Sequence, residues 1–131
     1  IGNFRKHYRT KKPANHSNQY TGQKGETYAC NYLTEKGYTV LHRNWRFKKT
    51  ETDIIASCDN VLHFIEVKTL NTPVDALPEL KVNKAKIQQM KLGAAGFLVE
   101  YPQWNFIQFD ILAIRFNGEN LADLLFIEDV F

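Results

Sequence analysis

The sequence is poor in several residue types that would otherwise define its class. It has two cysteines, which form no CxxC pair and have no nearby histidine at ligand spacing, so neither a zinc site nor a disulfide framework is predicted. We expect Cys30 and Cys58 to be small buried hydrophobic residues. The four histidines are scattered along the chain, and none of them indicates a catalytic or metal site.

Long hydrophobic runs are also absent. The apolar stretches extend for only a few residues, far below the roughly 18 that a membrane-spanning helix needs, and no leader of signal-peptide type opens the chain. We therefore expect a cytoplasmic protein with no membrane partner. A length of 131 residues with 44% hydrophobic residues is enough for one compact domain with its own core.

Acidic residues are missing from the first 25 positions, which carry a charge of +6, while the remainder of the chain carries −3. Residues 1–20 are polar and show no periodicity, so we expect a flexible basic N-terminal arm ahead of a single domain at 21–131. Such an uneven charge is typical of a protein with one face toward a polyanion. A solvated basic tail on an ordinary surface explains it equally well at this point.

The pattern of apolar residues predicts the secondary structure. A helical stripe that includes Ala29 and Leu33 runs over 22–36, and a second helix follows an N-cap at Asn83 over 83–98. Strands are expected at 38–47, 52–58, 61–68, 104–116 and 121–127. The order αβββαββ, with no repeat and no internal linker, predicts an α/β fold in which helices flank a mixed β-sheet.

Two of the expected strands form a hairpin around Asp59-Asn60, a pair that tolerates left-handed backbone conformations in a tight turn. If the turn is centred there, residues whose numbers sum to 119 lie opposite each other, so Asp53 faces Glu66. Directly opposed Cβ atoms are about 4.5 to 5.5 Å apart, and like charges there destabilise the sheet. Such a pair requires a compensating cation, and a hydrated Mg²⁺ ion held by the two carboxylates would supply it.

The same register places Glu51 opposite Lys68 and puts all four side chains on one face of the sheet. The backbone carbonyl of Val67 could add a third metal ligand. By spacing alone another arrangement stays open, in which the acids splay apart in solvent and Glu51 forms a weak surface ion pair with Lys68. Glu26 lies on the inward side of the first helical turn, where an acid complements the helix dipole without any further role.

Taken in order, these residues resemble a known nuclease fold. The pattern D-x₁₂-E-V-K, from Asp53 to Lys68 with a helix after it, resembles the PD-(D/E)xK superfamily, which has a restriction-endonuclease-like αβββαβ core. More narrowly, residues 21–131 look like the bacterial YraN-like family (uncharacterised protein family 0102), predicted endonucleases related to archaeal Holliday junction resolvases. The matching segments are GQKGETYACNYLTEKGYTVLHRNWR, ETDIIA, FIEVKT and FDILAI.

The resemblance implies a role for each residue of the expected site. Asp53 and Glu66 would ligate Mg²⁺ or Mn²⁺, and Lys68 would orient the attacking water or help to deprotonate it. Glu26 corresponds to the first-helix acid that many superfamily members place near the metal. Lys86 stands where the family usually carries lysine, in a first helical turn that suits a phosphate, although an exposed helix lysine would look the same.

Two positions depart from the family pattern. Thr50 replaces a glycine that usually stands before the position of Glu51, and Lys84 replaces a proline, which adds a positive charge. Neither change removes an expected metal ligand. DNA is the expected partner, because basic side chains track a nucleic-acid backbone without reading its sequence. The residues expected to contact it are Arg43, Arg46, Lys48, Lys49, Lys84 and Lys86.

The sequence therefore predicts a Mg²⁺-dependent endonuclease that hydrolyses DNA phosphodiesters. The related resolvases imply branched DNA as substrate and, because they act as dimers, a homodimer. The alternative is a nucleic-acid-binding module of the same fold that does not cut and that serves recombination or DNA uptake. A third hypothesis, a protein-interaction domain with incidental acids, gains support only from aromatic residues such as Trp45, Tyr101 and Trp104.

Overall fold

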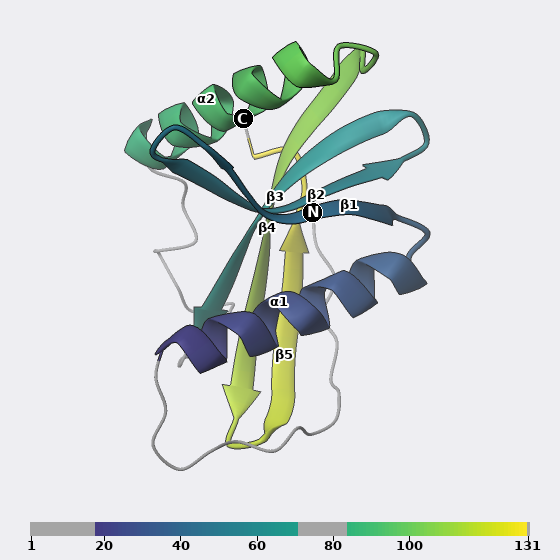
Figure 1. Cartoon of the computed structure of the whole chain (residues 1–131). Coiled ribbons are helices and arrows are strands. Elements are labelled where there is room, and N and C mark those ends of the chain that lie inside the picture. Colours follow the sequence, from purple (N-terminus) through teal and green to yellow (C-terminus); the bar gives the residue numbers. More distant parts are fainter. Residues whose placement is uncertain (1–17, 71–83, 131) are drawn as a thin grey trace.

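A computed structural model describes residues 18–70 and 84–130. The elements, in chain order, are helix α1 (Asn18–Glu35), strands β1 (Thr39–Phe47), β2 (Thr50–Cys58) and β3 (Val61–Leu70), helix α2 (Lys84–Glu100), and strands β4 (Phe106–Asn117) and β5 (Asn120–Ile127) (Figure 1). This order confirms the expected α/β fold with an αβββαβ core and one further strand.

The first helix begins earlier in the chain than the sequence predicted. Helix α1 begins at Asn18, so residues 18–20, which were assigned to the arm, are helical. Their polar composition did not prevent this, because polar residues lower helix stability by only about 0.7 kcal/mol or less each. The other residues of the expected arm, 1–17, lie outside the described residues.

The five strands form one mixed sheet in the order β1-β2-β3-β4-β5. Neighbouring strands are antiparallel except β3 and β4, which are parallel because α2 lies between them in the chain and returns it to the same end of the sheet. Strand β3 is central and is covered on both faces. That position explains why its sequence, VLHFIEVKTL, is apolar over most of its length rather than strictly alternating.

The β2–β3 hairpin has the expected turn. Strand β2 ends at Cys58 and β3 begins at Val61, and the two residues between them have positive φ angles, 51° for Asp59 and 65° for Asn60. Positive φ at both central residues is what a two-residue hairpin turn requires. The register also follows the prediction, with five pairs from Cys58↔Val61 to Ile54↔Ile65 whose numbers sum to 119.

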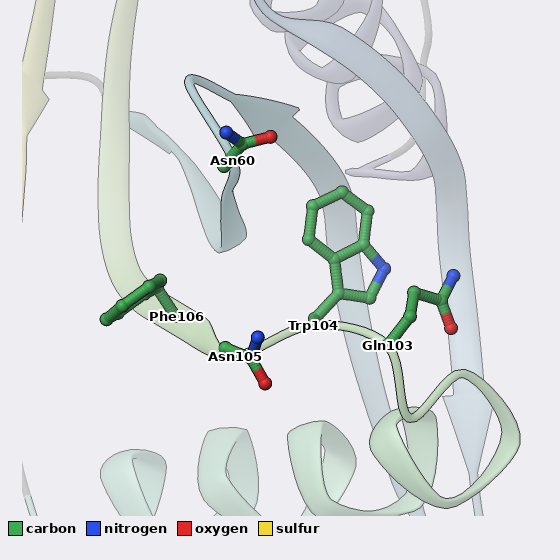
Figure 2. Close-up of a pocket in the computed structure, with 5 residues that line it drawn as sticks. All are labelled: Asn60, Gln103, Trp104, Asn105 and Phe106. Carbon is green, nitrogen blue, oxygen red and sulfur yellow. The ribbon is translucent and has the colours of Figure 1, made fainter.

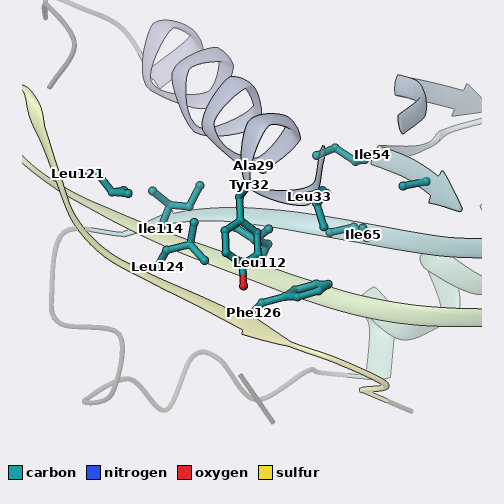
Figure 3. Packing of buried hydrophobic residues seen from close by; sticks show 11 residues of the cluster. Ala29, Tyr32, Leu33, Ile54, Ile65, Leu112, Ile114, Leu121, Leu124 and Phe126 are labelled. Atoms are coloured by element: carbon teal, nitrogen blue, oxygen red, sulfur yellow. The ribbon is translucent and has the colours of Figure 1, made fainter. Parts of the chain in front are cut away.

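Two hydrophobic cores lie on opposite faces of the sheet (Figure 1). Under α1, Ala29, Tyr32 and Leu33 pack on alternate residues of the strands, such as Ile54 and Ile65 (Figure 3). Burial of each large aliphatic side chain stabilises the fold by about 1.5 to 3 kcal/mol. The helical stripe predicted for the first helix is therefore confirmed at Ala29 and Leu33.

The second core lies under α2. Met90, Ala94 and Phe97 of this helix pack on Ile55 and Phe64. Successive residues of a strand point to opposite faces, so adjacent positions of β2 and of β3 contribute to different cores. The α2 layer matters for function because its N-terminal turn approaches the end of the β2–β3 pairing.

The two cysteines are free thiols, but neither is fully buried. Cys30 packs at the edge of the α1 core, where burial raises the pKa of its thiol. Cys58 is the last residue of β2, beside the exposed turn, so the expectation that it is a buried hydrophobic residue is wrong. Within the described ranges, neither helix is long and apolar enough to cross a membrane.

Candidate active site

Strands β2 and β3 separate at Asp53 and Glu66. Their pairing ends at Ile54↔Ile65, one position before the two acids would be opposed. Beyond this point the start of β2 stays paired with β1 only, and the end of β3 stays paired with β4 only. The two strands therefore form a fork, and the two acids that the hairpin register aligned stand at its base.

The carboxylate of Asp53 bridges the fork. Its Oδ2 accepts a hydrogen bond of 2.8 Å from the backbone N–H of Val67 on β3. This bond satisfies the backbone N–H of Val67, which lies beyond the last residue pair of β2 and β3. The N–H and C=O of one strand residue point toward the same neighbouring strand, so the Val67 carbonyl also faces the fork.

Asp53 reaches β3 because β2 rotates at this residue. The hydroxyl of Thr52 lies against Gly93 of α2, whereas Ile54, two positions later, packs under α1. In a regular strand these two side chains would share one face. Opposite this point β1 contains Asn44, which has a φ of 53°. The rotation directs the carboxylate of Asp53 along the sheet toward β3 rather than into either core.

The environment of Asp53 disfavours its charged form. Burial raises the pKa of its carboxyl to about 7, and the negative charges of Glu66 and Glu26 act in the same direction. The hydrogen bond from Val67 and the positive charge of Lys86 lower this pKa, but they do not offset the increase. A further cation beside Asp53 and Glu66 would therefore stabilise the site.

Lys86 of α2 already provides one positive charge at Glu66. Its Nζ lies 2.9 Å from Oε1 of Glu66, and the two side chains are 29% and 15% exposed. The helix delivers this lysine because its first turn lies over the fork. The resemblance assigned Lys86 to a phosphate, which stays a prediction, and its ion pair with the acid was not anticipated.

Glu26 approaches the same place from α1. The helix packs tightly on β3 at Gly25, where a Cβ atom would stand only 2.5 Å from Oγ1 of Thr69. The side chain of Glu26 is 15% exposed, and Nη2 of Arg43 lies 3.8 Å from its Oε1. Arg43 also donates a hydrogen bond of 3.4 Å to Thr27. In addition to burial, Glu66 of β3 and Glu26 of α1 are therefore close enough to Asp53 of β2 for both to raise its pKa.

The predicted opposition of Glu51 and Lys68 is wrong. The β2–β3 pairing ends at Ile54↔Ile65, before these two residues would be opposed. On its other side Glu51 pairs with Arg46 of β1, with Nε and Oε2 3.8 Å apart. Glu51 also lies between Thr50 and Thr52, which face α2, so it points to the other face. Lys68 is partly buried two residues after Glu66 on β3, and it forms no ion pair with any described residue.

The basic residues expected to contact DNA fall into two groups. Arg43 and Lys86 are ion-paired with acids of the site. The other four are not paired with these acids and have exposed side chains: Arg46, Lys48, Lys49 and Lys84. Of these, Arg46 pairs with Glu51. The ammonium group of Lys48 lies 5.4 Å from the centre of the Phe47 ring, next to the turn between β1 and β2. The second group is therefore sterically open to a polyanion.

The donor set fits a hydrated Mg²⁺ ion rather than a metal enclosed by protein. No group of three or more His, Cys, Asp or Glu side chains could hold a metal ion within 18–70 and 84–130. Mg²⁺, however, usually takes one or two carboxylates and keeps several waters. Asp53 and Glu66 supply two carboxylates, and the Val67 carbonyl faces the same gap. Burial and then the charge of Glu66 raise the pKa of Asp53, and a cation beside it would lower this pKa.

A second buried polar cluster was missed by the sequence reasoning. Nδ1 of His63 lies 2.7 Å from Oδ2 of Asp110, and both side chains are almost fully buried. Oδ1 of Asp110 accepts hydrogen bonds from Gln108 and from the backbone N–H of Asp129. The cluster thus ties the C-terminal segment to β4. The only signal in the sequence was two polar residues inside apolar strands.

Comparison with known proteins gives one consistent family. Residues 25–114 match the model of "Uncharacterised protein family UPF0102". A UPF0102 protein of Chlorobaculum parvum is 39% identical over 100 residues, which is 76% of this chain and 78% of that protein. A UPF0102 protein of Treponema denticola is 37% identical over 122 residues, which is 84% of this chain and 93% of that protein. The matched region contains every acid and lysine of the fork.

Proposed function

The chain belongs to uncharacterised protein family UPF0102, and we propose that it is a divalent-metal-dependent endonuclease that hydrolyses DNA phosphodiesters. The name of the family states no activity, so the proposal rests on the chemistry of the fork. The observation that carries it is the convergence of Asp53 and Glu66 where β2 and β3 separate, with the pKa of Asp53 raised to about 7.

The proposed metal site consists of a carboxylate from each side of the fork and the Val67 carbonyl. When bound, a divalent ion would lower the pKa of a coordinated water and neutralise charge that develops on the phosphate. Asp53 keeps one carboxylate oxygen on the N–H of Val67, which holds the other in a fixed direction. Oε1 of Glu66 lies 2.9 Å from Nζ of Lys86, so a bound metal would compete with this ammonium group for the carboxylate.

Lys68 and Glu26 would act on the water molecules that the metal binds. Lys68 is on the same strand as Glu66 and two residues beyond it, so in a regular strand both point to one face. Its ammonium group would orient the attacking water and favour its deprotonation. Glu26 lies close enough to raise the pKa of Asp53, and its carboxylate would hold a metal-coordinated water rather than the metal itself.

Exposed basic side chains near the β1–β2 turn and at the start of α2 would hold the DNA backbone. Contacts of this kind provide affinity that falls with salt concentration and do not select a sequence. A branched DNA substrate follows from the resemblance to resolvases. The geometry of the fork does not favour branched DNA over linear DNA.

One observation favours a second function. Lys86 neutralises Glu66 without any metal, which is also how a site would look if the fold bound nucleic acid and did not cut it. In that case the same basic residues would bind DNA, and divalent metal would have no effect on the product.

Incubation of the protein with linear duplex, single-stranded and four-way-junction DNA, with Mg²⁺ or Mn²⁺ and with EDTA, separates the two functions. We expect metal-dependent cleavage of at least one substrate, and loss of at least about a hundredfold in rate for Glu66→Gln and for Lys68→Ala. Glu100→Gln is a matched control, since it makes the same change at an exposed position at the other end of α2.

Cleavage that persists equally in Glu66→Gln and Lys68→Ala would refute the assigned site. Salt-sensitive binding without cleavage of any substrate would identify the protein as a binding module instead.

A further inference from the structure

A hollow of about 430 Å³ lies at the far end of the β2–β3 hairpin from the fork. It is lined by Asn60 of the hairpin turn, by Gln103, Trp104 and Asn105, which connect α2 to β4, and by Phe106, the first residue of β4. Figure 2 shows the Trp104 indole and the Asn60 carboxamide directed toward the same space from these two segments. Two parts of the chain that are distant in sequence therefore form the walls.

The lining combines two kinds of side chain and carries no charge. Trp104 packs partly on the core under α2, which fixes its ring, and Phe106 is 66% exposed, the second largest exposure of any large hydrophobic side chain in the described residues. The other three lining side chains are carboxamides, and each has a donor and an acceptor. Such a lining suits an uncharged, planar ligand with polar atoms at its edge.

A nucleobase has these properties. Its π-face stacks on aromatic side chains, which is worth about 1 to 3 kcal/mol per base. Its edge presents adjacent donors and acceptors that match the carboxamide of Asn or Gln. A phosphate or a carboxylate would gain nothing here, because no lining side chain is basic. In a duplex both faces of a base are stacked and its pairing edge is occupied, so the ligand must be unpaired.

The hollow and the fork lie near opposite ends of α2. Helix α2 runs from Lys86, at the fork, to the segment that lines the hollow, and its 17 residues span about 25 Å. At about 3.4 Å per stacked nucleotide this corresponds to roughly seven nucleotides of one strand. A strand whose phosphate lies at the fork can therefore place an unpaired base in the hollow.

We propose that the hollow formed by Asn60, Gln103, Trp104, Asn105 and Phe106 binds an unpaired nucleobase of a single-stranded nucleic-acid segment. This inference rests on the proposed function for the choice of nucleic acid as ligand, but base binding at this site needs no metal. The site would select substrates in which single-stranded DNA adjoins the phosphate to be cleaved.

Trp104 provides the readout. The chain has two tryptophans, so Trp45→Phe leaves Trp104 as the only indole. We expect a short single-stranded oligonucleotide to quench its fluorescence in EDTA, and an abasic oligonucleotide with the same number of phosphates to bind at least about tenfold more weakly. Equal quenching by the two oligonucleotides, or quenching by duplex alone, would overturn the proposal.

Two variants test whether the lining residues bind the base, at positions where the fold should tolerate the change. Phe106→Ser removes an exposed ring, and Asn60→Gly removes a carboxamide while glycine tolerates the φ of 65° at this position. We expect each to weaken single-strand binding by about threefold to tenfold. Val99→Ala is the control, because Val99 is 84% exposed on α2 and does not line the hollow.

Unchanged affinity in both variants would overturn the base site. The same outcome with cleavage retained would leave the proposed nuclease function intact. Conversely, base-dependent quenching in Glu66→Gln together with no cleavage by the wild-type protein would support the base site and reject the nuclease function.

Discussion

The ammonium nitrogen of Lys86 lies 2.9 Å from Oε1 of Glu66, across the gap between α2 and β3. This ion pair places a cation of the protein at the position where the nuclease proposal requires a metal. Metal and lysine should therefore compete for Glu66, and DNA phosphate gives the lysine another partner once metal is bound.

Replacement of Lys86 tests this competition directly. We expect Lys86→Gln to bind Mn²⁺ about threefold to tenfold more tightly in the absence of DNA, because the metal no longer has to displace the ammonium group. Isothermal titration calorimetry measures the change, and Lys91→Gln on the same helix is the matched control. Weaker Mn²⁺ binding in Lys86→Gln would show that the lysine supports the metal site rather than competing with it.

The raised pKa of Asp53 predicts how stability depends on pH. Between the ordinary value near 3.8 and about 7, the carboxyl is ionised in the unfolded chain but protonated in the folded protein. The folded state then binds more protons, so the free energy of unfolding decreases as pH rises through this window and is lowest above pH 7. Asp53→Asn removes this dependence and should be more stable than wild type at pH 8 by on the order of 2 to 4 kcal/mol.

Urea denaturation at pH 5 and pH 8 in EDTA measures this difference. Asp59→Asn is the control, because it makes the same chemical change in the exposed turn of the same hairpin, where asparagine tolerates a φ of 51°. If Asp53→Asn lost stability equally at both pH values, the hydrogen bond to Val67 would outweigh the cost of the buried charge.

Binding of Mg²⁺ should offset the loss of stability that the ionised carboxylate of Asp53 causes above pH 7. Mg²⁺ at about ten times its Kd stabilises a folded protein by about 1.4 kcal/mol, or about 4 to 7 °C in Tm for a chain of this size. We expect this increase at pH 8 and little of it at pH 5.5, where Asp53 is protonated. Differential scanning fluorimetry of wild type and Glu66→Gln measures it, and an equal increase in the two proteins would place the metal elsewhere.

The contact between α2 and β1 predicts a pair of glycine variants with opposite effects. A Cβ atom at Gly96 would penetrate the ring of Phe47, so Gly96→Ala should destabilise the protein by about 1 to 3 kcal/mol. Gly22 lies in α1 with no atom within 4 Å of such a Cβ, and Gly22→Ala should stabilise by about 0.5 to 1 kcal/mol. Thermal unfolding followed by circular dichroism compares the two, and equal Tm values would contradict the close packing at Gly96.

Features that depend on a few neighbouring residues could be predicted from the sequence. The turn at Asp59-Asn60 follows from two residues that accept positive φ, and the register of five pairs follows from the turn. The buried stripes of both helices follow from 3.6-residue spacing. Other features depended on several elements at once. The end of the β2–β3 pairing before Glu51 and Lys68 would be opposed is one example, and no property of these two residues indicates it.

The sequence by itself determined which acids approach each other, because the turn sets a register that pairs residues as far as Ile54↔Ile65 and brings Asp53 and Glu66 to the next position. Only the tertiary structure decided what surrounds them. The rotation of β2 at Asp53 directs its carboxylate to Val67, the packing of α2 brings Lys86 to Glu66, and the loop after α2 meets the hairpin turn to form the hollow. These contacts join segments far apart in the chain, and their geometry depends on how layers pack rather than on any local pattern.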